Sequence, residues 1–331
     1  MTTKILVTGV AGFIGSHIAA ALLARGDRVL GVDNLSPYYS PALKHARLAR
    51  LAAHRGFAFE EVDVTDEALV EAVPASWRDV ERVVHAAAQP GVRHSLAHPV
   101  GTARVNLLGQ VVIEEAIHRH LPKVRGLVYA STSSVYGRDT ASPFSPHAPA
   151  LRPVSAYAAS KRGAELMAES YTGLYGLPHL GLRFFTVYGR WGRPDMAYFI
   201  FTHRILGGQP IKLFGGEATR RDFTHVDDIV AGVLSGIDRV DRLPDRHTIL
   251  NLGNNRPERV IDLIRAIEGA SGREAAIEVT DLPPGDVPAT AADITPTTEL
   301  LGFRPTTRLA DGIADFVAWF READAGRFLP A

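Results

Sequence analysis

A short apolar run that leads through three glycines into a helical segment constrains the fold of this chain most strongly. Residues 4–8 have the pattern of a buried parallel strand. Gly9, Gly12 and Gly15 follow, and residues 16–25 have the pattern of an amphipathic helix. In this context glycines let the backbone approach a pyrophosphate, and the first N–H groups of the helix bind its oxygens. The pattern predicts a dinucleotide site; a glycine turn in an ordinary α/β protein is the alternative.

A carboxylate at the end of the second apolar run indicates which dinucleotide is bound. The run over residues 28–32 ends at Asp33, about twenty residues after the glycines, where dinucleotide folds place an acidic residue. A carboxylate there accepts hydrogen bonds from a ribose diol and repels a 2′-phosphate. We therefore expect NAD rather than NADP as the cofactor.

Strand-like and helical segments alternate along the chain, which predicts a Rossmann-like, doubly wound parallel α/β sheet. Further strands are expected over residues 57–62, 81–85, 125–130, 178–185, 211–214 and 248–252. Helices are expected from a cap near Thr65 or Asp66 and over residues 101–119, 157–175, 197–206, 226–237, 260–270 and 309–321. We expect residues 1–185 to form the dinucleotide-binding domain, with a return segment around 223–255. Residues 186–222 and 256–331 are expected to form a smaller C-terminal α/β domain that binds the substrate.

The composition limits the classes of function. Lys plus Arg and Asp plus Glu number 36 each, so the formal net charge is +0, which predicts neither a nucleic-acid nor a membrane partner. The chain has no cysteine, which excludes disulfides and thiolate chemistry. No His, Asp and Glu cluster has the spacing of a metal site, and no apolar run approaches the ~20 residues of a membrane span. We expect a soluble, cytoplasmic protein without a metal.

A tyrosine and a lysine four residues apart are the candidates for acid–base chemistry. On a helix, Tyr157 and Lys161 project from the same face. An ammonium beside a phenol is expected to lower the pKa of the phenol from about 10, which makes Tyr157 a general base near neutral pH. Thr132, Ser133 and Ser134 follow the strand over 125–130, at the edge where parallel sheets bind ligands. A turn cap is the alternative interpretation of these hydroxyls.

Together these motifs resemble the extended short-chain dehydrogenase/reductases that act on nucleotide sugars. The resemblance rests on the glycines, Asp33, residues 85–88, Asn106, residues 131–137, Tyr157, Lys161, residues 183–185 and residues 221–228. It implies that Thr132, Tyr157 and Lys161 are catalytic. It also implies a cofactor site formed by Gly9, Gly12, Phe13, Ile14, Gly15, Asp33, Asn34, Asp63, Val64, Ala86, Ala87, Ala88, Asn106, Tyr157 and Lys161.

Within that family, residues 33–39, 89–96 and 188–197 look like those of UDP-glucuronate 4-epimerases. The related dehydratases carry acidic residues in the slots of Ser133 and Ser134, and the decarboxylases carry Glu in the slot of Ser134. The resemblance implies a UDP-sugar partner and a substrate site of Pro90, Arg93, Thr132, Ser133, Ser134, Thr186, Arg193, Met196, Arg221 and Asp286. No second arginine stands near Asp286 for the diphosphate, and Arg193 is alternatively a solvated loop residue.

The resemblance implies 4-epimerisation of UDP-glucuronate to UDP-galacturonate through a transient 4-keto sugar. Neutral hydroxyls such as those of Ser133 and Thr186 are expected to orient the substrate carboxylate so that carbon dioxide is not lost. A 4-epimerase of UDP-glucose or UDP-N-acetylglucosamine, a UDP-glucuronate decarboxylase and an NAD-binding scaffold are the alternatives. The resemblance further implies a homodimer that pairs through the helices over 101–119 and 154–175.

Overall fold

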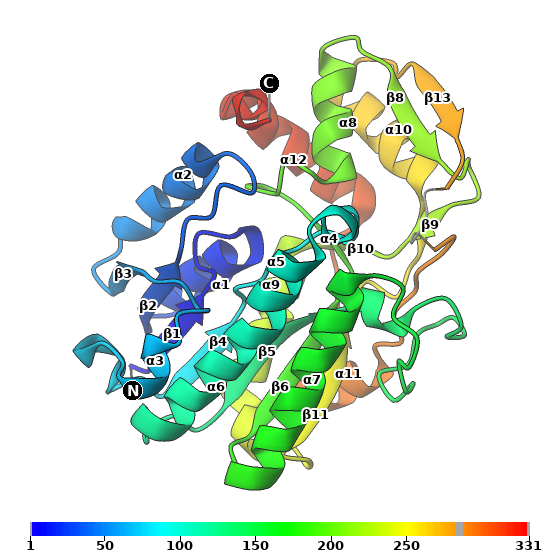
Figure 1. The fold of residues 1–331 in the computed structure, drawn as a ribbon. Helices are drawn as coiled ribbons and strands as arrows, with labels where there is room; N and C mark the ends of the chain where they lie inside the picture. Colours follow the sequence, from blue (N-terminus) through cyan, green and yellow to red (C-terminus); the bar gives the residue numbers. More distant parts are fainter. Residues whose placement is uncertain (1, 283–286, 330–331) are drawn as a thin grey trace.

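A computed structural model of the protein describes residues 2–282 and 287–329. Within these residues a seven-stranded sheet has the order β11-β6-β5-β4-β1-β2-β3, and every neighbouring pair is parallel (Figure 1). The strands are β1 (Lys4–Thr8), β2 (Arg28–Asp33), β3 (Phe57–Glu61), β4 (Arg82–His85), β5 (Leu127–Thr132), β6 (His179–Phe184) and β11 (His247–Leu252). The prediction of a doubly wound parallel sheet is confirmed.

The strand order reverses between β1 and β4, and this reversal locates the ligand crevice. From β1 the chain proceeds outward to β2 and β3, then returns to the other side of β1 with β4, β5 and β6. In open parallel sheets, ligands bind at the carboxyl ends of the strands where the order reverses. The glycine-rich turn after β1 and the hydroxyl-rich segment after β5 both lie at that edge.

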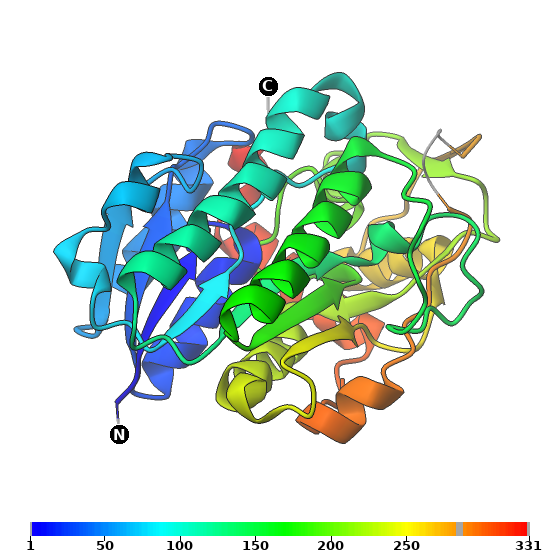
Figure 2. The same ribbon diagram turned by 60° about the horizontal axis from the view of Figure 1, so that its bottom comes forward.

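Helices cover both faces of the sheet. One layer contains α1 (Phe13–Ala24), α2 (Pro41–Ala52), α9 (Val226–Arg239) and α11 (Thr295–Leu301), and the other contains α3 (Ala68–Glu71), α6 (Gly109–His120) and α7 (Ala156–Tyr175). Helices α6 and α7 lie side by side along the sheet (Figure 2). Side chains of successive residues in β1 enter different cores: Ile5 and Val7 lie on the α1 and α9 side, and Leu6 on the α6 side.

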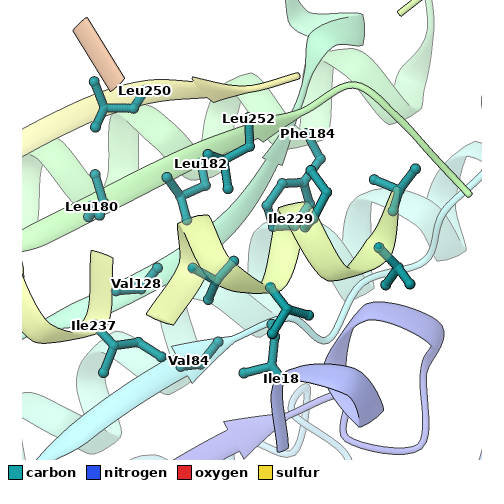
Figure 3. Packing of buried hydrophobic residues seen from close by; sticks show 14 of the residues in the cluster. Ile18, Val84, Val128, Leu180, Leu182, Phe184, Ile229, Ile237, Leu250 and Leu252 are labelled. Carbon is teal, nitrogen blue, oxygen red and sulfur yellow. The ribbon is translucent and has the colours of Figure 1, made fainter. Parts of the chain in front are cut away.

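An apolar core holds α9 against strands β4, β5, β6 and β11 of the sheet. Ile229 and Ile237 on α9 lie over Val84, Val128, Leu182 and Leu252 of the central strands (Figure 3). These side chains are almost completely buried. Burying a side chain of this size contributes about 1.5–3 kcal/mol, so this packing holds the strand ends that present the candidate reactive groups.

A second group of helices lies beyond the carboxyl edge of the sheet (Figure 1), and a second apolar cluster holds it together. It packs α8 (Ala197–Leu206), α10 (Val260–Ser271) and α12 (Leu309–Glu322) around Phe199, Ile264 and Phe316. The parallel pair β8 (Ile211–Phe214) and β13 (Ile277–Thr280), and the short strands β7 (Thr186–Tyr188), β9 (Arg220–Arg221), β10 (Phe223–His225) and β12 (Glu258–Arg259), complete this region. The domain boundaries at 185, 222 and 255 stay a prediction.

Two expected helices differ from the prediction. The helix over 101–119 consists of α5 (Pro99–Ala103), a π-helical turn (Arg104–Leu108) and α6. The helix after Thr65 is reduced to the single turn of α3, because Asp63 and Asp66 bind nearby backbone N–H groups in turns. The short α4 (Val92–Ala97), α2 and α11 were not expected. Across the described residues, none of the helices has the length and apolarity that a membrane crossing needs.

Candidate active site

The three glycines after β1 form a turn that no larger residue fits. Gly9 has φ of +70°, and a Cβ on it would lie 2.6 Å from the backbone nitrogen of Ala87. A Cβ on Gly15 would lie 2.2 Å from the carbonyl oxygen of Gly9. Helix α1 begins directly after Gly12. Because glycine has no side chain that could cap the helix, the first N–H groups of α1 are left for a ligand in the crevice. The turn fits a dinucleotide pyrophosphate, which needs close backbone approach and free helical N–H groups.

Asp33, at the end of β2, lies beside this turn. Its Oδ2 accepts a hydrogen bond from the Ala11 N–H (3.1 Å), and its Oδ1 accepts from the Leu35 N–H (2.9 Å). Lys44 of α2, which the sequence did not single out, lies 3.3 Å from Oδ1 and is buried with it. The carboxylate is thus held at the position expected for a ribose contact.

Asp63 contacts the side chain of Asn34 rather than the crevice itself. It accepts hydrogen bonds from Asn34 Nδ2 (3.0 Å) and from the Thr65 N–H (2.8 Å). Burial alone would raise the pKa of Asp63, but these hydrogen bonds bring that pKa below its usual value. Asp63 is therefore ionised and holds the Asn34 side chain at the rim of the crevice.

One cavity of about 550 Å³ collects most of the predicted site residues. Those expected to bind the cofactor and lining it are Gly9, Gly12, Phe13, Ile14, Gly15, Asp33, Asn34, Val64, Ala86, Ala87, Ala88, Tyr157 and Lys161. Those expected to bind the substrate and lining it are Pro90, Arg93, Thr132, Ser133, Ser134, Thr186, Arg193, Met196 and Arg221. Asp63 and Asn106 are not among its lining residues, and Asp286 lies outside the residues that the structure describes.

Thr132 and Tyr157 come from the end of β5 and the first turn of α7. The Thr132 Oγ1 accepts a hydrogen bond from the Ser134 N–H (3.2 Å) and so caps the 3₁₀ turn Ser133–Tyr136. The cap does not remove the side chain from the cavity, so the structural and functional interpretations of this segment hold together. Ser155 starts α7 by accepting a hydrogen bond from the Ala158 N–H (3.1 Å), which places Tyr157 at the cavity wall.

The pKa of Tyr157 differs from the expectation. Burial raises it above its usual value, while a hydrogen bond with Thr132 and the positive charge of Arg193 oppose the rise. Burial lowers the pKa of Lys161 to about 8, with Glu165 opposing this change. The expectation that Lys161 depresses the Tyr157 pKa was wrong for the folded chain, because desolvation outweighs the nearby charges. The cation that acts on the phenol is Arg193.

Asn106 connects the loop after β4 with α7. From the π-helical turn its Oδ1 accepts a hydrogen bond from the Gln89 N–H (2.8 Å), and its Nδ2 donates to the Gln89 carbonyl (3.1 Å) and to Ser160 Oγ (3.0 Å). The side chain is buried. Asn106 therefore holds the Ala86–Pro90 wall of the cavity against the residue that precedes Lys161.

A buried ion pair supports the reactive groups from below. Glu165, one turn after Lys161, accepts hydrogen bonds from Arg183 Nε and Nη2 (both 2.8 Å), Ser131 Oγ (2.6 Å) and Arg162 Nη1 (2.9 Å). Burial alone would raise the pKa of Glu165, but Arg183 and these hydrogen bonds bring that pKa below its usual value. The pair connects α7 with β6 and with the residue before Thr132.

Several basic side chains line the cavity. Arg221 donates from Nη1 to the carbonyl of Arg220 (2.9 Å), and the Arg93 guanidinium lies 4.8 Å from the centre of the Phe214 ring. Lys212 also lines the cavity but was not predicted. These cations suit a ligand with negative charges.

The fold and the cavity agree with the comparisons with known proteins. The family model for NAD dependent epimerases and dehydratases matches residues 5–253. The chain therefore belongs to the NAD dependent epimerase/dehydratase family, and the resemblance inferred from its motifs is confirmed.

Similar proteins include 4-epimerases named for two different UDP-sugars. The chain is 42% identical to UDP-glucuronate 4-epimerase 4 of Arabidopsis thaliana, with 96% of this chain and 75% of that protein covered. The structure of UDP-glucuronic acid 4-epimerase from Bacillus cereus in complex with UDP-glucuronic acid and NAD has a TM-score of 0.87 at 30% identity, with 97% and 100% covered. A UDP-glucose 4-epimerase from Thermotoga maritima has a TM-score of 0.86 at 31% identity, with 97% and 99% covered.

Proposed function

We propose that this protein catalyses the NAD-dependent 4-epimerisation of UDP-glucuronate to UDP-galacturonate. The observation that carries the proposal is the cavity that brings Thr132, Tyr157 and Lys161 together with the glycine-rich turn and with the charge of Arg193. The similarity to UDP-glucuronate 4-epimerases, which covers 96–97% of this chain, supports the proposal.

The cofactor fits the residues that are present. Gly9, Gly12 and Gly15 leave room for a pyrophosphate, and Asp33 offers its carboxylate to a ribose. When bound, NAD would accept the hydride from carbon 4 of the sugar and would return it to the same carbon. The chain's own residues move the proton and hold the sugar.

Tyr157 is the proposed base for the sugar 4-hydroxyl. Thr132 hydrogen bonds with the phenol. We propose that its hydroxyl also binds the oxygen of the sugar 4-hydroxyl, from which Tyr157 removes the proton. The positive charge of Arg193 favours the phenolate, which becomes available as the pH approaches the pKa of Tyr157. The same phenol returns the proton after the keto sugar has rotated and presents its other face to the cofactor site.

The substrate carboxylate needs a fixed orientation, because a 4-keto uronic acid loses carbon dioxide when its carboxylate bond aligns with the carbonyl π system. Ser133, Ser134 and Thr186 line the cavity with neutral hydroxyls. Arg193 adds a positive charge beside Tyr157, which the sequence did not assign to the carboxylate. We propose that these four side chains hold the carboxylate away from the aligned orientation.

The diphosphate is proposed to bind beside basic side chains of the cavity. Arg221 lines it, and a guanidinium binds phosphate oxygens in a bidentate manner. Arg93 and Lys212 line the same cavity, and they supply the further positive charge that the sequence near Asp286 lacks.

Identification of the product tests the function. Purified protein is incubated with UDP-glucuronate and NAD, and the products are separated and identified by proton NMR. UDP-galacturonate without accumulated NADH supports the proposal. A UDP-pentose indicates a decarboxylase, conversion of UDP-glucose alone indicates a neutral-sugar epimerase, and NAD binding without turnover indicates a scaffold; each of these three results rejects it.

Substitution of the neutral hydroxyls tests the carboxylate orientation separately. Ser133→Ala and Thr186→Ala are expected to raise the ratio of decarboxylated by-product to epimer, because each removes a donor to the carboxylate. The ratio is measured by chromatography of the reaction products. Unchanged ratios in both variants would contradict this part of the mechanism.

Assembly and location complete the proposal. We propose a homodimer through α7, on which Leu166, Leu174 and Tyr175 are 49%, 68% and 47% exposed although they are apolar or aromatic. Light scattering after gel filtration should report twice the mass of one chain, and Leu174→Glu should reduce the measured mass to that of one chain. A cytoplasmic location is proposed as well, and cell fractionation tests it.

A further inference from the structure

An arginine on α2 is completely buried and uses every donor that it has. Arg47 donates from Nε to the carbonyl of Trp191 (3.0 Å), from Nη1 to the carbonyl of Ala11 (3.0 Å) and to Tyr39 Oη (2.7 Å), and from Nη2 to the carbonyls of Trp191 (2.6 Å) and Gly192 (3.1 Å). Its exposed fraction is 0%. An arginine has five N–H donors, and all five end here on uncharged oxygens.

The backbone carbonyls among these acceptors belong to two segments that lie far apart in the sequence. Ala11 is in the glycine-rich turn, between Gly9 and Gly12. Trp191 and Gly192 are 144 and 145 residues away from Arg47, in the loop over residues 189–196. The guanidinium therefore joins the turn that fits the cofactor to the loop that carries Arg193 and Met196.

The loop has a conformation that is not determined by its own sequence. Trp191 has φ of +58°, a left-handed conformation that is unusual for a residue with a side chain. The carbonyls of Trp191 and Gly192 accept hydrogen bonds from Arg47. Arg193, the next residue, lines the cavity, forms two hydrogen bonds to Asp195 (3.0 Å each) and acts on Tyr157. A residue held at such φ persists only when its surroundings fix it, and Arg47 supplies that fixation.

We propose that Arg47 is a positioning residue that sets Arg193 beside Tyr157 by fastening the 189–196 loop to the glycine-rich turn. This inference rests on the proposed function, because it assigns Arg47 a role in the same site. It implies that the cofactor turn and the substrate loop share one buried anchor. A shift of the turn is therefore expected to pass to the loop through this side chain.

Lysine is the informative replacement at this position. Arg47→Lys keeps the charge, but its compact ammonium lacks the planar fork that spans three carbonyls. We expect kcat/KM for UDP-glucuronate to fall about 10- to 100-fold, the loss that follows when a reacting group is misplaced by about 1 Å. Arg50→Lys is the matched control. Arg50 is exposed one turn later on α2, and its contact with the loop is the stacking of its guanidinium over the Trp191 ring at 4.7 Å. Its kcat/KM should stay within about twofold of wild type, as for most surface substitutions.

A double-mutant cycle distinguishes positioning from a general loss of structure. If Arg47 acts through Arg193, Arg47→Lys should change kcat/KM by less than about threefold once Arg193→Gln is present, because coupled residues are not additive. Full multiplication of the two single effects would overturn the proposal, since it would mean that Arg47 acts independently of Arg193.

A readout independent of activity separates this proposal from the proposed function. Trypsin cleaves after Arg190, which is exposed at the start of the loop, and mass spectrometry measures the rate of cleavage at that bond. Arg47→Lys should raise this rate about tenfold or more, since local opening controls such cleavage, and Arg50→Lys should not. If Arg47→Lys does not fold, Tyr39→Phe removes one acceptor of Arg47 and keeps the ring, and it should raise the rate by a smaller factor. An unchanged rate in a folded Arg47→Lys variant, or in Tyr39→Phe when Arg47→Lys does not fold, overturns the inference even if the enzyme proves to act on another sugar.

Discussion

Replacing Glu165 with glutamine should destabilise the protein strongly, although it replaces only one carboxylate oxygen with an amide NH2 group. The carboxylate is fully buried and accepts four hydrogen bonds, two of them from Arg183. Glu165→Gln leaves the Arg183 guanidinium, which is 2% exposed, without its counter-charge. Removing one partner of a buried pair costs about 3–5 kcal/mol. At ~2–4 °C per kcal/mol, the value for chains of 150–250 residues, the melting temperature should fall by about 6–20 °C, with the lower end expected for this longer chain.

The assay is urea unfolding at pH 7, followed by circular dichroism. Glu169→Gln is the matched control, because Glu169 is exposed one turn later on α7, and it should change the free energy of unfolding by less than about 0.5 kcal/mol. Adding Arg183→Met to Glu165→Gln should recover part of the loss, because a neutral pair does not leave a buried charge. A loss below about 1 kcal/mol for Glu165→Gln would refute the reasoning that the pair is buried and uncompensated.

The sign of the pH dependence follows from the lowered pKa of Glu165. A carboxyl whose folded pKa lies below its unfolded value contributes stability above that unfolded value, about 4.3. This contribution is lost as the pH falls through the folded pKa. The difference between wild type and Glu165→Gln should therefore be full at pH 7 and shrink in acid. A difference that grows below pH 4 would contradict the assignment.

Two further predictions concern ligand binding and the base. Gly15→Ala should weaken NAD binding at least about 100-fold by calorimetry, because its Cβ would lie 2.2 Å from the Gly9 carbonyl in a turn that must stay closed to bind the pyrophosphate; Gly173→Ala, which meets no atom within 4 Å, is the control, and equal affinities would contradict the turn. Arg193→Gln should move the rising limb of log kcat/KM against pH to higher pH, because the charge that lowers the Tyr157 pKa is removed; a limb at the wild-type pH would show that another group titrates.

The parts of the site that depend on local patterns were predictable from the sequence. Gly9, Gly12 and Gly15 directly follow a strand, and Asp33 ends the next strand, so their spacing alone places them at one sheet edge. Thr132 is predictable for the same reason. These positions need no knowledge of distant contacts, because the carboxyl ends of parallel strands meet at one edge.

The parts that depend on burial or on distant partners were not predictable. The π-helical turn at Asn106 has the same apolar pattern as an α-helix, so periodicity cannot reveal it. Lys44 and Arg47 look like surface residues of a basic helix until the fold brings Asp33 and Trp191 to them. The pKa of Tyr157 was expected to be low from its spacing to Lys161, but its burial, which the sequence does not show, raises it.

The most direct test of the account follows the hydrogen at carbon 4 of the sugar. UDP-glucuronate deuterated at that carbon is incubated with the NAD-loaded protein in ordinary water, and the product is examined by NMR and mass spectrometry. The account predicts UDP-galacturonate that retains the deuterium at carbon 4, because the same hydrogen leaves and returns to that carbon while Tyr157 moves only the hydroxyl proton. A product that has lost the deuterium, or a UDP-pentose, would contradict the central claim.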